Sequence, residues 1–228
     1  MLKQFIEGGN KSVVFLKRNR KIKPKGGIVK LNLGCGLSVA PGWINIDASL
    51  NALFAEWPAP VLNFLYRQAG AQRWYSKEQY IDILKDHVFL HHDLEYGIPF
   101  VDESVDYIYT SHWLEHLFLD QAERLLRDAY RVLKTGGRIR ICVPDLEFAV
   151  TAYLRGEKEK AVSYFFSTSH AGRLGRHQYL YDYELLRGLL FEVGFGDAQR
   201  CSYREGKTPE IDQLDNRPDE TLYVEATK

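Results

Sequence analysis

Apolar residues along this chain recur in two spacings. Short apolar runs typical of strands occur at about 28–33, 43–46, 87–90, 105–110, 138–143, 197–204 and 221–227. Between them, apolar positions three and four residues apart predict helices at about 61–69, 77–85, 121–134, 145–155, 158–166 and 183–193. This alternation predicts an α/β fold with a doubly wound, mainly parallel sheet of seven strands. The last two strands are expected to add an antiparallel hairpin to that sheet.

The helix predicted at 121–134 has the clearest boundary signals. Asp120 followed three residues later by Glu123 matches a capping box, which predicts the start of the helix. Gly136-Gly137 is expected to end it, because glycine readily leaves the helical conformation.

One domain with two additions is expected. A chain of 228 residues is long enough for one sizeable core, which we assign to residues 26–228, with a helical insertion at about 48–86. Residues 1–25 form an N-terminal arm, either extended or weakly helical. Residues 1–30 carry nine Lys and Arg side chains against one Glu, whereas the remainder carries 21 basic and 29 acidic side chains. A basic arm is compatible with an acidic partner or with plain solvation. The acidic remainder argues against nucleic acid.

Cysteine usage and hydropathy bear on the compartment. Cys35, Cys142 and Cys201 have no paired metal-ligand spacing, and free thiols are typical of a reducing cytoplasm. No apolar run approaches the roughly 18 residues that a membrane span needs. Residues 1–20 lack the apolar core of a signal peptide. The sequence therefore predicts a cytoplasmic protein without a transmembrane segment and leaves its oligomeric state open.

Two strand ends carry residues suited to a nucleoside. Gly34-Cys35-Gly36 follows the first predicted strand, and glycine lets a backbone approach a ligand closely. Asp47 ends the second strand, where an acid can accept hydrogen bonds from a ribose diol. Only residues 34–42 separate these strands, so the usual crossover helix must be a turn or absent. A Gly-x-Gly sequence alone also fits a simple tight turn.

These motifs, in order, resemble those of the class I S-adenosylmethionine-dependent methyltransferases, and among them the broad group called type 11. The resemblance rests on residues 31–36, Asp47, His92-Asp93-Leu94, residues 105–108 with 111–116, and residues 131–137. It implies a Rossmann-like fold, S-adenosylmethionine as cofactor, and methyl transfer. It also implies that the cofactor contacts Leu33, Gly34, Cys35, Gly36, Asp47, Asp93, Leu94, Ser111 and His112. In this interpretation Asp47 accepts from the ribose, and Asp93 from the adenine amino group.

Methyl transfer requires alignment of acceptor and donor, and removal of a proton if the acceptor is a hydroxyl or a cationic amine. The candidate proton acceptors are His112, His177 and Asp145, together with His116, which is ranked below His112. A polar cluster late in the chain either recognises the acceptor or is a solvated loop. Its members are His170, Arg173, Arg176, His177 and Tyr179.

No metal site is predicted. His112 and His116 are four residues apart, but the acid between them is Glu115, which is not the His-Glu-x-x-His order of metalloproteases. The histidines and cysteines also lack a paired ligand spacing.

The predicted function is therefore methyl transfer from S-adenosylmethionine to a small-molecule or carbohydrate acceptor. The carbohydrate suggestion comes from similarity to methyltransferases associated with surface polysaccharide assembly. A non-catalytic S-adenosylmethionine-binding module acting with a partner is an alternative. An NAD-type oxidoreductase is a further one, disfavoured by the short glycine motif. The methylated atom is left open.

Overall fold

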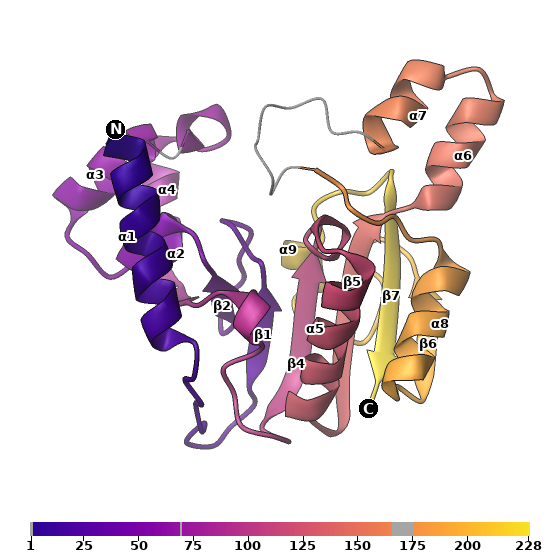
Figure 1. Ribbon diagram of the computed structural model, residues 1–228, viewed down its shortest axis with the longest axis horizontal. Helices are drawn as coiled ribbons and strands as arrows, with labels where there is room; N and C mark the ends of the chain where they lie inside the picture. Colours follow the sequence, from indigo (N-terminus) through magenta and orange to yellow (C-terminus); the bar gives the residue numbers. More distant parts are fainter. Residues whose placement is uncertain (1, 69, 166–175) are drawn as a thin grey trace.

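A seven-stranded sheet forms the centre of the molecule, with strand order β3-β2-β1-β4-β5-β7-β6. The computed structural model describes residues 2–68, 70–165 and 176–228, and Figure 1 shows helices α5 and α8 across one face of the sheet. The strands are β1 (Lys30–Leu33), β2 (Ile44–Asp47), β3 (Val88–His91), β4 (Val105–Ser111), β5 (Leu133–Pro144), β6 (Asp197–Cys201) and β7 (Thr221–Thr227).

The helices follow the predicted alternation with the strands. They are α1 (Leu2–Lys17), α2 (Leu50–Phe54), α3 (Ala59–Gln68), α4 (Lys77–Asp86), α5 (Leu119–Val132), α6 (Leu146–Leu154), α7 (Lys158–Phe165), α8 (Tyr183–Val193) and α9 (Ile211–Leu214). Three short 3-10 helices are η1 (Ala71–Arg73), η2 (Leu94–Tyr96) and η3 (Leu114–His116). None of the described helices is both long and apolar enough to cross a bilayer.

The sheet topology confirms the predicted fold class. Strands β1 to β5 pair in parallel, while β7 is antiparallel to both β5 and β6 and lies between them. Residues 34–43 form turns rather than a crossover helix, as the short spacing between β1 and β2 required. The carboxyl ends of β1, β2, β4 and β5 consequently lie along one edge of the sheet, which is where ligands bind in open α/β sheets.

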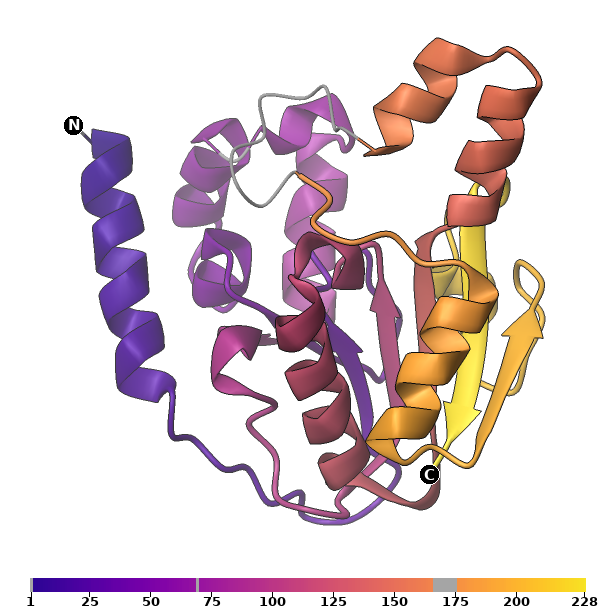
Figure 2. The same cartoon turned by 45° about the vertical axis from the view of Figure 1, so that its right-hand side comes forward.

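The two faces of the sheet have different cores because side chains alternate along each strand. Leu31 and Leu33 of β1 are fully buried in the main apolar core, to which α5 and α8 also contribute. Figure 2 shows these two helices side by side on that face. Asn32, between the two leucines, points to the opposite face and donates to Asn45 Oδ1 at 3.0 Å. That second face is therefore a buried polar surface as well as an apolar one.

Helix α5 begins and ends earlier than the sequence pattern predicts. Its N-cap residue is Phe118, and Gln121 Oε1 accepts the Phe118 backbone N–H at 3.1 Å, so the predicted capping by Asp120 and Glu123 is wrong. Both acids instead form ion pairs on the helix surface four residues along, with Arg124 and Arg127 respectively. The helix ends at Val132 because Leu133 already has extended backbone and pairs with β4.

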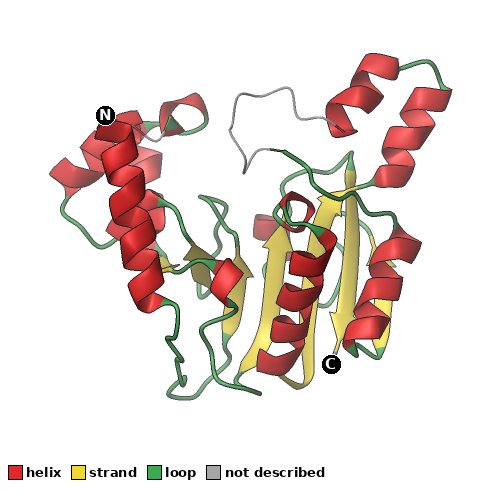
Figure 3. Ribbon diagram, viewed as in Figure 1, coloured by secondary structure: helices red, strands yellow, loops and turns green. Residues whose placement is uncertain are grey.

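The segment between β2 and β3 forms a helical lobe beside the β3 edge, visible in Figure 3. The helices predicted at 61–69 and 77–85 are present as α3 and α4, and they share a small apolar core that includes Leu62, Tyr80 and Leu84. The aromatic residues of this segment thus serve partly as core. Helix α1 lies alongside, and its Asn10 side chain bridges Ala48 O and His91 Nε2 at 2.9 Å each.

Candidate active site

The turn after β1 brings Gly34 against the turn after β4. Gly34 has a left-handed backbone with φ of +64°, and its N–H donates to Ile46 O at 2.9 Å. A Cβ at this position would overlap the Trp113 indole, lying 2.5 Å from Cδ1 and 2.9 Å from Cβ. Gly34 is therefore required by Trp113 and by its own φ. Gly36 also has a positive φ, +54°, but nothing lies within 4 Å of where its Cβ would be.

Asp47 connects the ends of β1 and β2. Its Oδ2 accepts the Gly36 N–H at 2.9 Å, and its Oδ1 accepts the Ser49 N–H at 2.7 Å. A carboxylate offers about four lone-pair directions, so each oxygen keeps capacity for another donor. Asp47 thus orders the glycine turn and can still accept the hydroxyls of a ribose.

A cavity of about 350 Å³ opens at this turn, and we call it the glycine-turn cavity. It contains five of the nine predicted cofactor contacts: Gly34, Cys35, Gly36, Ser111 and His112. The rest of its wall includes Trp74, Tyr75, Tyr109, Asn216 and Arg217.

Of the other predicted contacts, Leu33 is buried in the core, and Asp47 lies behind Gly36. Asp93 caps η2 by accepting the Glu95 N–H at 2.9 Å. Leu94 is buried and lines a separate cavity together with Trp113. The Trp113 ring therefore lies between Gly34 and the cavity that Leu94 lines.

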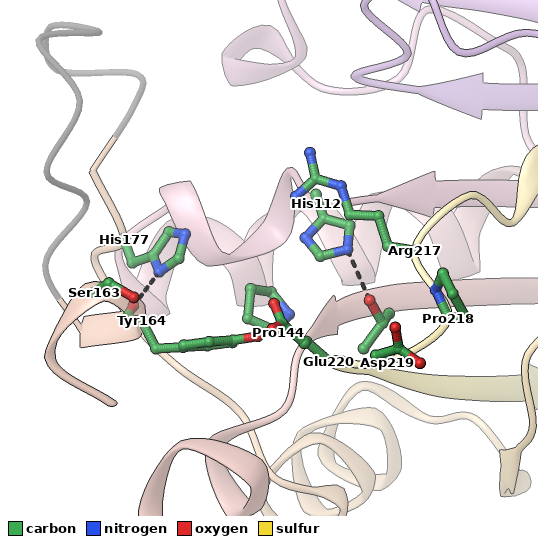
Figure 4. Close-up of a pocket in the computed structure, with 10 residues that line it drawn as sticks. His112, Pro144, Ser163, Tyr164, His177, Arg217, Pro218, Asp219 and Glu220 are labelled. Carbon is green, nitrogen blue, oxygen red and sulfur yellow. Dashed lines mark hydrogen bonds between the residues drawn. The ribbon is translucent and has the colours of Figure 1, made fainter. Parts of the chain in front are cut away.

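A second cavity, of about 330 Å³, lies at the carboxyl end of β5, and we call it the Pro144 cavity. Figure 4 shows His112 and Arg217 on one side of it and His177 with Tyr164 on the other. His112 and Arg217 line both cavities and form their common wall.

His112 is held in an unusual conformation at this common wall. Its φ is +50°, a region that non-glycine residues seldom adopt and that is frequent at functional sites. Its ring Nε2 lies 3.0 Å from Thr221 Oγ1, and its Nδ1 lies 3.4 Å from Glu115 Oε1. Burial lowers the pKa of His112, although Glu115 opposes that shift. The ring is thereby fixed between β4 and β7.

Arg217 reaches the common wall because a buried ion cluster fixes the loop that carries it. Arg140 of β5 is fully buried, and its guanidinium binds Asp215 at 2.6 and 3.1 Å and Glu225 at 3.2 Å. It also donates to the carbonyls of residues 202 and 205. The next two residues after Asp215 are Asn216 and Arg217, so the cluster positions both cavity residues.

The structure brings only some of the candidate proton acceptors together. His177 lines the Pro144 cavity and its Nδ1 lies 2.6 Å from Tyr164 O. Asp145 caps α6 by accepting the Glu147 N–H and pairs with Arg200 at 2.8 Å. Burial raises the pKa of Asp145, but its side chain is engaged by these contacts. Of the predicted polar cluster, His170 and Arg173 lie outside the described residues.

Several lining residues escaped the sequence analysis. Trp113 lies within residues 111–116, and Trp74 and Tyr75 lie within the insertion at about 48–86, but none of the three was among the predicted site residues. Asn216 and Arg217 lie in a polar loop with no motif, and nothing local points to them.

A family model and several solved structures resemble this chain. Residues 59–141 match the family model Methyltransf_11, described as a methyltransferase domain. Among curated proteins, no sequence matches the chain.

Similar solved structures include that of SibL, an S-adenosylmethionine-dependent methyltransferase. It is 19% identical with a TM-score of 0.53, and the alignment covers 88% of this chain and 50% of SibL. The chain thus spans about half the length of SibL, and the likeness shows the fold. An S-adenosylmethionine-dependent methyltransferase from Archaeoglobus fulgidus is 16% identical, with 96% and 94% of the two chains covered and a TM-score of 0.49. One from Mesorhizobium loti is 17% identical, with 91% and 94% covered and the same TM-score.

Residues 59–141 thus match a methyltransferase domain, and the chain has a Rossmann-like fold similar to that of the methyltransferase SibL.

Proposed function

We propose that the chain methylates a small polar acceptor, such as a carbohydrate hydroxyl, bound in the Pro144 cavity. The observation that carries the proposal is the wall of His112 and Arg217 that this cavity shares with the glycine-turn cavity. Because the two cavities share these lining residues they adjoin, so ligands bound in them can be aligned beside His112 and Arg217, which is what group transfer requires.

The residues of the glycine-turn cavity fit the methyl donor. The open space beside Gly36 is room that any larger side chain would fill. The spare acceptor capacity of Asp47 suits the ribose, and we assign Ser111 and His112 to the donor's reactive end. We place Asp93 and the Leu94 backbone at the adenine end, whereas the Leu94 side chain faces the separate cavity that Trp113 also lines. When bound, S-adenosylmethionine supplies a methyl group on a positively charged sulfur, which needs no further activation.

The Pro144 cavity suits a neutral polar acceptor. Its wall carries a guanidinium from Arg217, carboxylates from Asp219 and Glu220, and the hydroxyl of Tyr164. Mixed charges of this kind offer both donors and acceptors to hydroxyl groups. A volume of about 330 Å³ lies within the range of small-molecule sites.

His112 is our first candidate for the group that accepts the acceptor's proton, because it faces both cavities. His177 is the second candidate and faces the Pro144 cavity alone. Asp145 ranks below them because Arg200 and the α6 N-terminus occupy its oxygens.

The test is a methyl-release assay with a panel of hydroxylated small molecules and saccharides, using His112→Ala and His177→Ala. His87→Ala is the matched control, since His87 is another half-buried histidine whose Nδ1 contacts a backbone carbonyl, Ile83 O at 3.0 Å, in the helical lobe. We expect turnover to fall by on the order of 100-fold or more in His112→Ala and to stay unchanged in the control. Full turnover in both His112→Ala and His177→Ala would exclude each as the base.

The turnover assay, combined with binding measurements, separates this proposal from its alternatives. Binding of S-adenosylmethionine without turnover of any acceptor would favour a non-catalytic module acting with a partner. Competition by nicotinamide dinucleotides, with no binding of S-adenosylhomocysteine, would favour an oxidoreductase instead.

A further inference from the structure

A buried carboxylate lies next to the common wall without a hydrogen-bond donor. Glu115 belongs to η3, and its side chain is 1% exposed. Among the described residues, neither of its oxygens accepts a hydrogen bond. Burying a carboxylate is costly unless a cation or several donors compensate it. The groups around Glu115 therefore indicate which cation could compensate its charge.

Besides His112, two imidazoles lie close to Glu115, and backbone carbonyls fix the orientation of both. His116 Nδ1 lies 3.1 Å from Arg176 O, and His177 Nδ1 lies 2.6 Å from Tyr164 O. A carbonyl oxygen only accepts, so in the neutral rings Nδ1 carries the proton and Nε2 keeps a free lone pair. The same outer contact orients most metal-binding histidines in proteins.

We propose that Glu115, His116 and His177 form a binding site for a first-row divalent transition-metal ion such as Zn²⁺. One potential ligand atom of each residue lies within 4.8 Å of those of the other two. His116 Nε2 and Glu115 Oε1 are 3.9 Å apart. Bonds of about 2.1 Å in a tetrahedral site place ligand atoms about 3.4 Å apart. This pair therefore needs to close by only about 0.5 Å, which side-chain rotation supplies.

The ligand types select the metal. Two imidazoles and one carboxylate suit zinc and its neighbours in the first transition row. Calcium and magnesium favour sites built from oxygen atoms. His112 Nδ1, 3.4 Å from Glu115 Oε1, is placed to orient the carboxylate from outside the metal site.

The position of the site suggests its use. His177 lines the Pro144 cavity, so a metal bound there lies at the edge of the space in which we place the acceptor. A divalent ion lowers the pKa of a hydroxyl that binds to it and so favours loss of its proton. This use rests on the proposed function, whereas metal binding itself does not. In such a site His177 acts as a ligand rather than as a base.

Cobalt titration of the full chain tests the site. Chelator-treated protein is titrated with Co²⁺ and followed by visible absorption, and Zn²⁺ is then added to displace it. We expect one Co²⁺ per chain, displaced by Zn²⁺. Glu115→Gln and His177→Ala should each weaken binding by on the order of 100-fold. His87→Ala, the distant matched histidine, should bind as the unchanged protein does.

Two results would overturn the proposal. One is the absence of saturable binding by the unchanged protein. The other is binding that survives both Glu115→Gln and His177→Ala, since scattered surface histidines would then be the ligands. Circular dichroism verifies that each variant is folded. If Glu115→Gln does not fold, His177→Ala decides the result, because its side chain is only half-buried.

The titration contains neither methyl donor nor acceptor, so its outcome is independent of turnover. Loss of metal binding with intact methyl transfer would overturn the metal site alone. Metal binding with no methyl transfer to any acceptor would count against the proposed acceptor and leave the metal site standing.

Discussion

The two glycines of the β1 turn provide a matched pair of substitutions. Gly34→Ala and Gly36→Ala add the same methyl group at left-handed positions, with φ of +64° and +54°. An L-residue in that conformation costs about 1–2 kcal/mol relative to glycine, and both variants incur this cost. The two positions differ only in their surroundings.

At Gly34 the new methyl group meets the Trp113 ring, whereas at Gly36 it enters open space. Overpacking of this kind adds about 1–3 kcal/mol. We therefore expect Gly34→Ala to lower the free energy of unfolding by about 2–5 kcal/mol and Gly36→Ala by about 1–2 kcal/mol. Gly36→Ala should instead weaken S-adenosylmethionine binding, because its methyl group occupies the glycine-turn cavity.

Urea denaturation followed by far-ultraviolet circular dichroism measures these differences. Tryptophan fluorescence is avoided because Trp113 itself contributes to it. A double-mutant cycle with Trp113→Ala isolates the clash and should give a coupling energy of about 1–3 kcal/mol. Equal destabilisation by the two glycine variants, or a coupling energy near zero, would refute the reasoning. Calorimetric titration with S-adenosylmethionine completes the comparison.

Three further outcomes follow from contacts described above. Asp47→Ala should weaken S-adenosylhomocysteine binding by at least about 10-fold in calorimetry, since a charge-assisted hydrogen bond contributes about 1.5–3 kcal/mol; unchanged affinity would remove Asp47 from the site. Arg140→Met should lower the free energy of unfolding by about 3–5 kcal/mol, because Asp215 and Glu225 would remain buried without their cation; a loss below about 1 kcal/mol in urea denaturation would contradict this. Glu225 is buried, which by itself raises its pKa, but the backbone N–H groups of Lys207 and Thr208, together with Arg140, lower it below its ordinary value of 4.5. Its stabilising contribution is thus present above that pH and lost as the pH falls through the folded pKa, so unfolding free energy should depend less on pH below about 5 in Glu225→Gln than in the unchanged protein.

The sheet was predictable because strands buried on both faces occur in the sequence as short apolar runs separated by turn residues. Helix boundaries were less so. Asp120 and Glu123 have the spacing of a capping box, but both pair with arginines one turn later, and Gln121, the third residue of the helix, caps it instead. Local patterns of this kind offer several registers, and packing of the helix on the sheet selects one.

The same distinction applies to the site. The glycine turn, Asp47, Ser111 and His112 follow directly after strands, so topology alone brings them to one edge of the sheet. Arg217 is placed there because Arg140, buried on β5, binds Asp215 two residues before it. The pairing of Glu115 and His116 with His177 joins residues about 60 positions apart, and spacing rules for metal ligands search only short distances along the chain.

The common wall of His112 and Arg217 has a consequence for the order of events in the catalytic cycle. If donor and acceptor occupy the two cavities as proposed, a ligand on one side that orders the exposed Arg217 side chain reduces the entropy that a ligand on the other side must remove. Thermodynamic reciprocity then requires donor and acceptor to strengthen each other's binding by the same factor. The demethylated donor left after transfer would share that advantage, so a trapped ternary complex of product and fresh acceptor is expected to limit turnover when the acceptor is abundant.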